Sequence, residues 1–107
     1  PVILPPPAVR GTASLRGPTG CTAPGAVLTR ITGRNMRIVR FYRDGALVKT
    51  VKLMDGRIRT ATLRTRIEPT DFMMHTVVAR VTFAKGSTPA RKTLLHRFAQ
   101  CKSEVTG

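Results

Sequence analysis

The run from His75 to Phe83 constrains the fold more than any other part of the sequence, because apolar or ring-bearing side chains recur in it at every second position. Every second position carries an apolar or aromatic ring-bearing side chain: His75, Val77, Ala79, Val81 and Phe83. Successive side chains of a β-strand point to opposite faces, so this pattern predicts a strand with one buried face and not a helix. The length and regularity of the run place it at the centre of a sheet.

Turn signals recur about every ten residues along the chain. Asp44-Gly45 and Asp55-Gly56 each follow an alternating run, and Asp-Gly suits a hairpin because both turn residues tolerate positive φ. Between the turns, the sequence predicts further strands over residues 11–16, 26–32, 35–43, 46–53, 58–66 and 91–101. Seven short strands in about 95 residues favour an all-β, immunoglobulin-like antiparallel sandwich over an up-and-down barrel.

The predicted core is built mainly from aliphatic residues. Aromatic residues make up 5% of the chain and Trp is absent, while the apolar fraction of 41% is below the usual share of about 45–50%. In the run 35–43, Arg37, Val39 and Phe41 share one face, and we expect Val39 and Phe41 to point inward. A core of this size gains from a covalent link.

Two cysteines, Cys21 and Cys101, lie near opposite ends of the predicted sandwich. Neither belongs to a CxxC pair and no histidine cluster accompanies them, so a disulfide is favoured over zinc, with two free thiols as the alternative. It would close a long loop, and the chain-entropy model assigns roughly 4 kcal/mol of stabilisation to that closure. A disulfide also predicts a secreted or cell-surface location. Cys101 differs in parity from Phe98, which requires a bulge or a sulfur that leaves the sandwich near its edge.

The chain divides into three parts by composition. Residues 1–8 are rich in proline and are predicted to form a linker or arm, residues 9–101 the sandwich, and residues 102–107 a C-terminal tail. Val2, Ile3 and Leu4 form a possible strand-donor arm that would pair with the sheet edge of a neighbour. No stretch of about 18 apolar residues is present, so we expect no membrane span.

Four short sequence words occur in a fixed order along nearly the whole chain. They are GTASL at 11–15 before Cys21, VRFYRDG at 39–45, HTVVARVTF at 75–83, and KTL at 92–94 before Cys101. Together they resemble bacterial immunoglobulin-like domains found in exported multi-module proteins of actinobacteria. The resemblance implies spacer, stalk, assembly or adhesion units whose partners are neighbouring modules of the same or identical chains, without catalytic residues. It departs at Ala61, where such domains often carry an aromatic residue.

The residues with reactive side chains show no pattern of an enzyme or metal site. His75 is predicted to pack and to bond a loop carbonyl, and His96 lies in phase with Phe98 without a second metal ligand beside it. The serines lack the context of a nucleophile elbow, and the five acidic residues are too few and too scattered for a glycosidase pair or a calcium site. We therefore expect no catalytic, cofactor or metal site.

The net charge is the strongest indication of a ligand. Nineteen Lys and Arg against five Asp and Glu give +14, which attracts anionic cell-envelope polymers or nucleic acid. An arginine-rich composition also arises from a GC-rich genome without any ligand. Arg40, Arg64 and Arg80 are predicted to face solvent and to form a possible anionic-polymer surface. Tyr42 is the one outward ring available for base stacking, so specific nucleic-acid binding is disfavoured.

Overall fold

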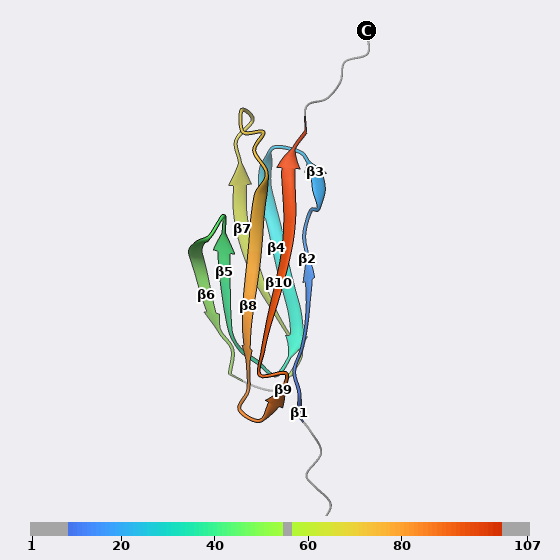
Figure 1. The fold of residues 1–107 in the computed structure, drawn as a ribbon, viewed down its shortest axis with the longest axis vertical. Helices are drawn as coiled ribbons and strands as arrows, with labels where there is room; N and C mark the ends of the chain where they lie inside the picture. The colour runs from blue at the N-terminus through green and yellow to red at the C-terminus, as the bar shows by residue number, and fades with distance from the viewer. Residues whose placement is uncertain (1–8, 55–56, 102–107) are drawn as a thin grey trace, which may run out of the picture.

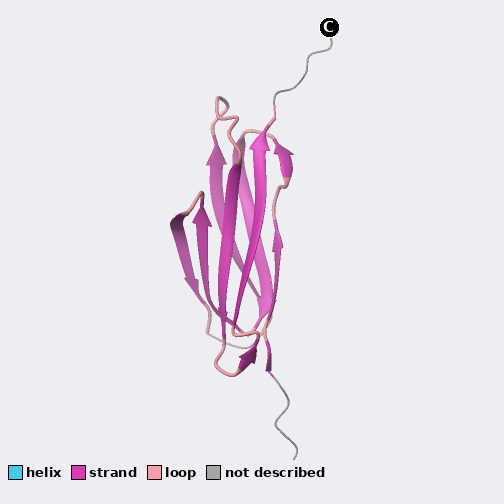
Figure 2. Ribbon diagram, in the orientation of Figure 1, coloured by secondary structure: helices cyan, strands magenta, loops and turns pink. Residues whose placement is uncertain are grey.

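The computed structural model describes residues 9–54 and 57–101, and within them the chain forms strands and no helix (Figures 1 and 2). In chain order the strands are β1 (Val9–Arg10), β2 (Thr12–Arg16), β3 (Gly20–Thr22), β4 (Gly25–Arg34), β5 (Met36–Arg43), β6 (Ala46–Lys52), β7 (Arg59–Ile67), β8 (His75–Phe83), β9 (Ser87–Thr88) and β10 (Arg91–Gln100).

The strands form two packed sheets. The first has the order β3-β10-β8-β5-β6 and the second the order β2-β4-β7, while β1 and β9 form a short parallel pair. Within the two sheets, neighbours are antiparallel except β3 and β10, which run in the same direction. This arrangement confirms the predicted all-β, immunoglobulin-like sandwich, and β8 is the central strand of the larger sheet, as its alternation predicted.

The core lies between the two sheets and uses the inward positions of β4, β5, β7, β8 and β10. Its largest fully buried side chains include Phe41, Phe98, Ile31, Met36 and Ile67. Burying a side chain of this size stabilises the fold by about 1.5–3 kcal/mol before entropy is counted. Val39 and Phe41 point inward as predicted, and Ala61 is also buried in the core.

The alternation of β5 is interrupted at its start, which corrects one prediction. Arg37 was expected on the same face as Val39, but Met36 takes the inward position and Arg37 is exposed. The pairing with β8 shifts between Met36 and Ile38, so one extra residue is accommodated there as a β-bulge. A bulge changes the parity of every residue before it, and period-two counting carried across it assigns the wrong face.

The turn between β5 and β6 has the predicted form. Asp44 and Gly45 have φ values of 51° and 89°, which is the positive-φ pair that a two-residue hairpin requires. The second Asp-Gly pair, at residues 55–56, lies outside the described residues. Strand β6 follows the turn but is exposed along almost its full length, because the three-stranded sheet does not extend beneath it.

Strand β3 was not predicted, and it explains how the first part of the chain changes sheets. The chain leaves β2 in the smaller sheet, crosses through Gly17, and continues as β3 on the edge of the larger sheet. A Cβ at Gly17 would lie 2.8 Å from the ring of His96, so the crossover needs glycine to pass this close. Gly17 and Pro18 interrupt the strand pattern just before β3, so a strand of only three residues is not recognised from the sequence.

The chain enters and leaves the sandwich at opposite ends of its long axis. Strand β1 lies at the lower end in Figure 1, and β10 ends at the upper end, next to β3. The predicted arm with Val2, Ile3 and Leu4, and the predicted tail at residues 102–107, lie outside the described residues.

Candidate functional site

The three arginines singled out from the sequence are all exposed but do not share a face. Arg40 on β5 is the register partner of Arg80 on β8, so these two lie side by side on the outer face of the five-stranded sheet. Arg64 lies on β7, on the outer face of the other sheet. The structure therefore brings Arg40 and Arg80 together and separates Arg64 from them. Alternation shows that a residue faces outward, but not which sheet its strand joins.

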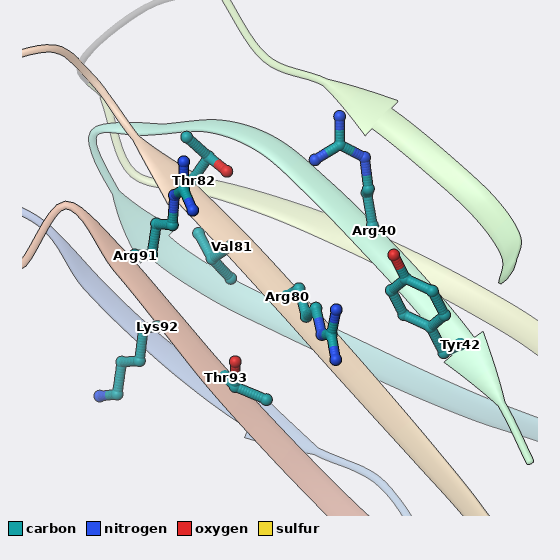
Figure 3. Close-up of a pocket in the computed structure, with 8 residues that line it drawn as sticks. All are labelled: Arg40, Tyr42, Arg80, Val81, Thr82, Arg91, Lys92 and Thr93. Atoms are coloured by element: carbon teal, nitrogen blue, oxygen red, sulfur yellow. The ribbon is translucent and has the colours of Figure 1, made fainter. Parts of the chain in front are cut away.

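A shallow depression of about 250 Å³ surrounds Arg40 and Arg80 (Figure 3). It extends over β5, β8 and β10, and its rim includes three residues that sequence reasoning did not select: Arg91, Thr82 and Thr93. Thr93 is the register partner of Arg80, and Arg91 is the partner of Thr82. Their selection required knowing that β10 pairs with β8, a contact between segments that the alternation pattern does not specify.

Tyr42 orients one of these cations. The Arg80 guanidinium carbon lies 5.0 Å from the centre of the Tyr42 ring, a cation–π distance. The Tyr42 side chain is half-buried, and the Arg80 guanidinium lies over its ring. Lys92 borders the same depression, but its Nζ donates to the carbonyl of Ala13 at 3.2 Å and is directed away from the other cations.

The acidic residues of the described chain are held elsewhere. Glu68 pairs with Arg66, with 3.3 Å between Oε1 and Nε. Asp44 and Asp71 both bind His75 at the start of β8. The cations of the outer face therefore have no carboxylate partner among residues 9–54 and 57–101.

His75 is held between two carboxylates and not by the loop carbonyl that we expected. Its Nδ1 lies 2.7 Å from Asp44 Oδ2, and its Nε2 lies 2.6 Å from Asp71 Oδ2. Asp44 also accepts from the N–H of Thr76 at 2.9 Å, and Asp71 accepts from the N–H of Met73 at 3.0 Å. His75 thus ties the β5–β6 turn to the β7–β8 loop. Local sequence patterns do not indicate this link, because Asp44 lies 31 residues from His75 along the chain.

The three groups shift one another's pKa values. The hydrogen bond to Asp44 is the largest cause of a raised pKa for His75, opposed by burial and supported by Asp71. Burial raises the pKa of Asp44, but the bonds from His75 and from the Thr76 N–H outweigh it, so the net pKa is lowered. The pKa of Asp71 is lowered mainly by the Met73 N–H and then by His75. The cluster is most stable with His75 charged and both aspartates ionised.

His96 is buried between the sheets and has a different role. Its Nδ1 donates to the carbonyl of Pro18 at 2.7 Å, and its Nε2 forms a 2.8 Å hydrogen bond with the hydroxyl of Thr29. Its ring stacks on Phe98, with 5.3 Å between centroids. His96 therefore fastens the crossover before β3 to the core.

The predicted disulfide joins Cys21 on β3 to Cys101 just after β10. The two Cα atoms lie 5.3 Å apart, and both residues are exposed. The pairing of β10 with β8 and β3 is regular up to its last residues, so the parity of Cys101 places the sulfur outside the sandwich at its edge. This resolves the choice left open by the sequence in favour of the edge and against a bulge.

Both ring nitrogens of each histidine are engaged in hydrogen bonds within the protein. Within the described residues, no group of three or more His, Cys, Asp or Glu side chains is placed to hold a metal ion. The same residues contain no helix of the length and apolarity needed to cross a membrane.

Comparisons of this chain with known proteins gave no match. No family model matches the chain, and neither a curated protein nor a solved structure matches it significantly.

Proposed function

We propose that this chain is a non-catalytic, extracellular immunoglobulin-like module that serves as a spacer or stalk unit in a secreted or cell-surface bacterial protein. The resemblance to actinobacterial modules supports this role, as does the disulfide, which persists in oxidising compartments.

The position of the disulfide on the path of the chain carries this proposal. When the two ends are pulled apart, tension acts first on β1, is transmitted along β2 and reaches Cys21 on β3. From Cys21 the covalent bond transfers tension to Cys101, where the chain leaves the sandwich. The residues enclosed between the two cysteines, including most of the core, are outside that path.

Single-molecule force spectroscopy on the full chain, placed between two marker domains, tests this mechanism. With the disulfide intact, only the dozen or so residues before Cys21 are released, and they lengthen only slightly because most of them already form extended strands. After reduction, the 80-residue separation is released as well, which adds about 280 Å to the unfolding step. The double variant C21S/C101S should give the long step with or without reductant.

An oxidised protein that extends as far as the reduced one would overturn the proposal, because the disulfide would then not limit extension. A short step in the oxidised protein, a long step after reduction, and a long step in C21S/C101S under both conditions would together support it.

A second observation favours contact with a neighbouring module. The β7–β8 loop lies at the end where β10 finishes, and it exposes Phe72, Met73 and Met74 by 43%, 73% and 61%. Gln100 fixes this loop, since its amide nitrogen lies within 3.1 Å of the carbonyls of Glu68, Pro69 and Asp71. A fixed apolar loop beside the chain exit suits packing against the module that follows.

A further inference from the structure

The outer face of the five-stranded sheet carries a charge arrangement that a spacer does not need. Arg40 stands directly opposite Arg80, and like charges opposite each other on neighbouring strands destabilise a sheet. Arg91 lies two positions from Thr93, the residue that faces Arg80 on β10. No carboxylate in the described part of the chain pairs with these arginines. An anionic ligand would remove the repulsion.

The face is also partly organised for such a ligand. Tyr42 orients Arg80, so less side-chain freedom is lost when that guanidinium binds. The hydroxyls of Thr82 and Thr93 line the same depression (Figure 3). Its volume of about 250 Å³ lies below the range of roughly 300–1,000 Å³ in which small molecules are enclosed. An open face of this size fits a charged group on a polymer that lies along the sheet.

The side chains present favour a sugar polymer over a nucleic acid. Guanidinium groups donate paired hydrogen bonds to carboxylate, sulfate or phosphate, and threonine hydroxyls bond to sugar hydroxyls. Proteins that bind single strands stack bases on exposed aromatic rings. Here the one ring in the depression, Tyr42, is already covered by Arg80.

We propose that this face, defined by Arg40, Tyr42, Arg80, Arg91, Thr82 and Thr93, binds an acidic glycan. The arginines pair with its anionic groups and the threonines with its hydroxyls. This binding is separate from the spacer role, because the chain path and the disulfide do not involve these residues.

Binding to immobilised polymers at low and physiological salt tests the inference. Dextran sulfate and polygalacturonate are the acidic glycans, neutral dextran is the uncharged counterpart, and single-stranded oligo-dT represents nucleic acid. We expect both acidic glycans to bind, neutral dextran not to bind, and affinity to fall steeply as salt rises. R40E/R80E should lower affinity for both acidic glycans by about tenfold or more.

The molecule offers a matched control on its other face. Arg16 on β2 and Arg30 on β4 are also register partners, and both are exposed beside a depression lined by hydroxyl groups. They differ from the proposed face in orientation, because Arg80 lies over the Tyr42 ring, whereas no aromatic residue is among the described residues that line the depression beside Arg16 and Arg30. R16E/R30E changes the net charge by the same amount as R40E/R80E, and we expect it to lower affinity by less than about threefold, since only distant charge is altered. Thermal melts verify folding, and R40Q/R80Q replaces R40E/R80E if that variant does not melt cooperatively.

Two results would overturn the inference. Equal loss of affinity in the two double variants would mean that net charge alone attracts the polymers. Tighter binding of oligo-dT than of either glycan, retained at physiological salt, would identify the face as a nucleic-acid surface. Selective loss in R40E/R80E, with the glycans bound more tightly than oligo-dT, supports the proposal.

Discussion

At one edge of the five-stranded sheet, β3 is fastened by a disulfide and by the crossover bond to His96. At the other edge, β6 is held mainly by its backbone pairing with β5. Strand β3 has three residues and a partner far away in sequence, so its few hydrogen bonds do not compensate the entropy of closing a long loop. Strand β6 has seven residues and follows a two-residue turn. The comparison shows that extra fastening occurs where local pairing is weakest.

The largest expected effect comes from opening the fastened edge. Reducing the disulfide, or the variant C21S/C101S, should lower the free energy of unfolding by up to about 4 kcal/mol, because the unfolded chain regains the freedom of a long loop. Chemical denaturation with and without reductant measures this difference. Alkylation of two thiols in the native, unreduced protein would contradict the disulfide and remove its support for an extracellular location.

A smaller loss is expected when the second fastening of the same edge is removed. His96→Ala leaves the Pro18 carbonyl and the Thr29 hydroxyl without this partner and opens a cavity beside Phe98. The free energy of unfolding should fall by about 2–4 kcal/mol, as measured by denaturant titration. Leu47→Ala on β6 is the control at the opposite edge, where a 54%-exposed side chain is removed with little cost. Equal losses in the two variants would contradict the difference between the edges.

The smallest effect concerns the turn that leads to β6, and it depends on pH. The raised pKa of His75 means that its contribution is fully present below its ordinary value of 6.5 and is lost as pH rises through the raised value. Asp44 and Asp71, with lowered pKa values, contribute above their ordinary value of 3.8 and lose the contribution as pH falls through the lowered values. The cluster therefore stabilises the fold most between about pH 4 and 6.5.

The variant His75→Gln isolates this effect. Melting temperatures of both proteins at pH 5.5 and 8.5 give the measurement, and wild type should lose more of its stability towards the higher pH than the variant does. Other groups titrate equally in the two proteins, so the difference belongs to the cluster. The prediction fails if the two pH profiles are parallel.

The elements predictable from the sequence are those whose signal is local. The alternation of β8, the Asp44-Gly45 turn and the inward positions Val39 and Phe41 each depend on a few consecutive residues. The two cysteines were paired by elimination, because no other ligand or partner was present. These features needed no knowledge of which strands become neighbours.

The rest depends on pairing between distant segments. Strand β3 exists because β10 lies beside it, and the bulge at Arg37 appears in the register with β8. The separation of Arg64 from Arg80 follows from sheet membership, which outward parity does not encode. The partners of His75 come from a turn and a loop that meet only after the sheets have packed.

Lys49 affects how the sheet edges on one side of the sandwich can pair with a strand of another molecule. From β6 its Nζ donates to the carbonyl of Thr62 on β7, at 2.7 Å, so it spans the outer strands of both sheets on one side of the sandwich. Sheet edges are templates for aggregation, and a lysine placed at an edge opposes it, since its charge must be desolvated before another strand pairs. A strand arriving here, including one donated by Val2, Ile3 and Leu4 of a second copy, has to displace this ammonium first. We therefore expect this side of the sandwich to resist edge-to-edge strand pairing at high protein concentration.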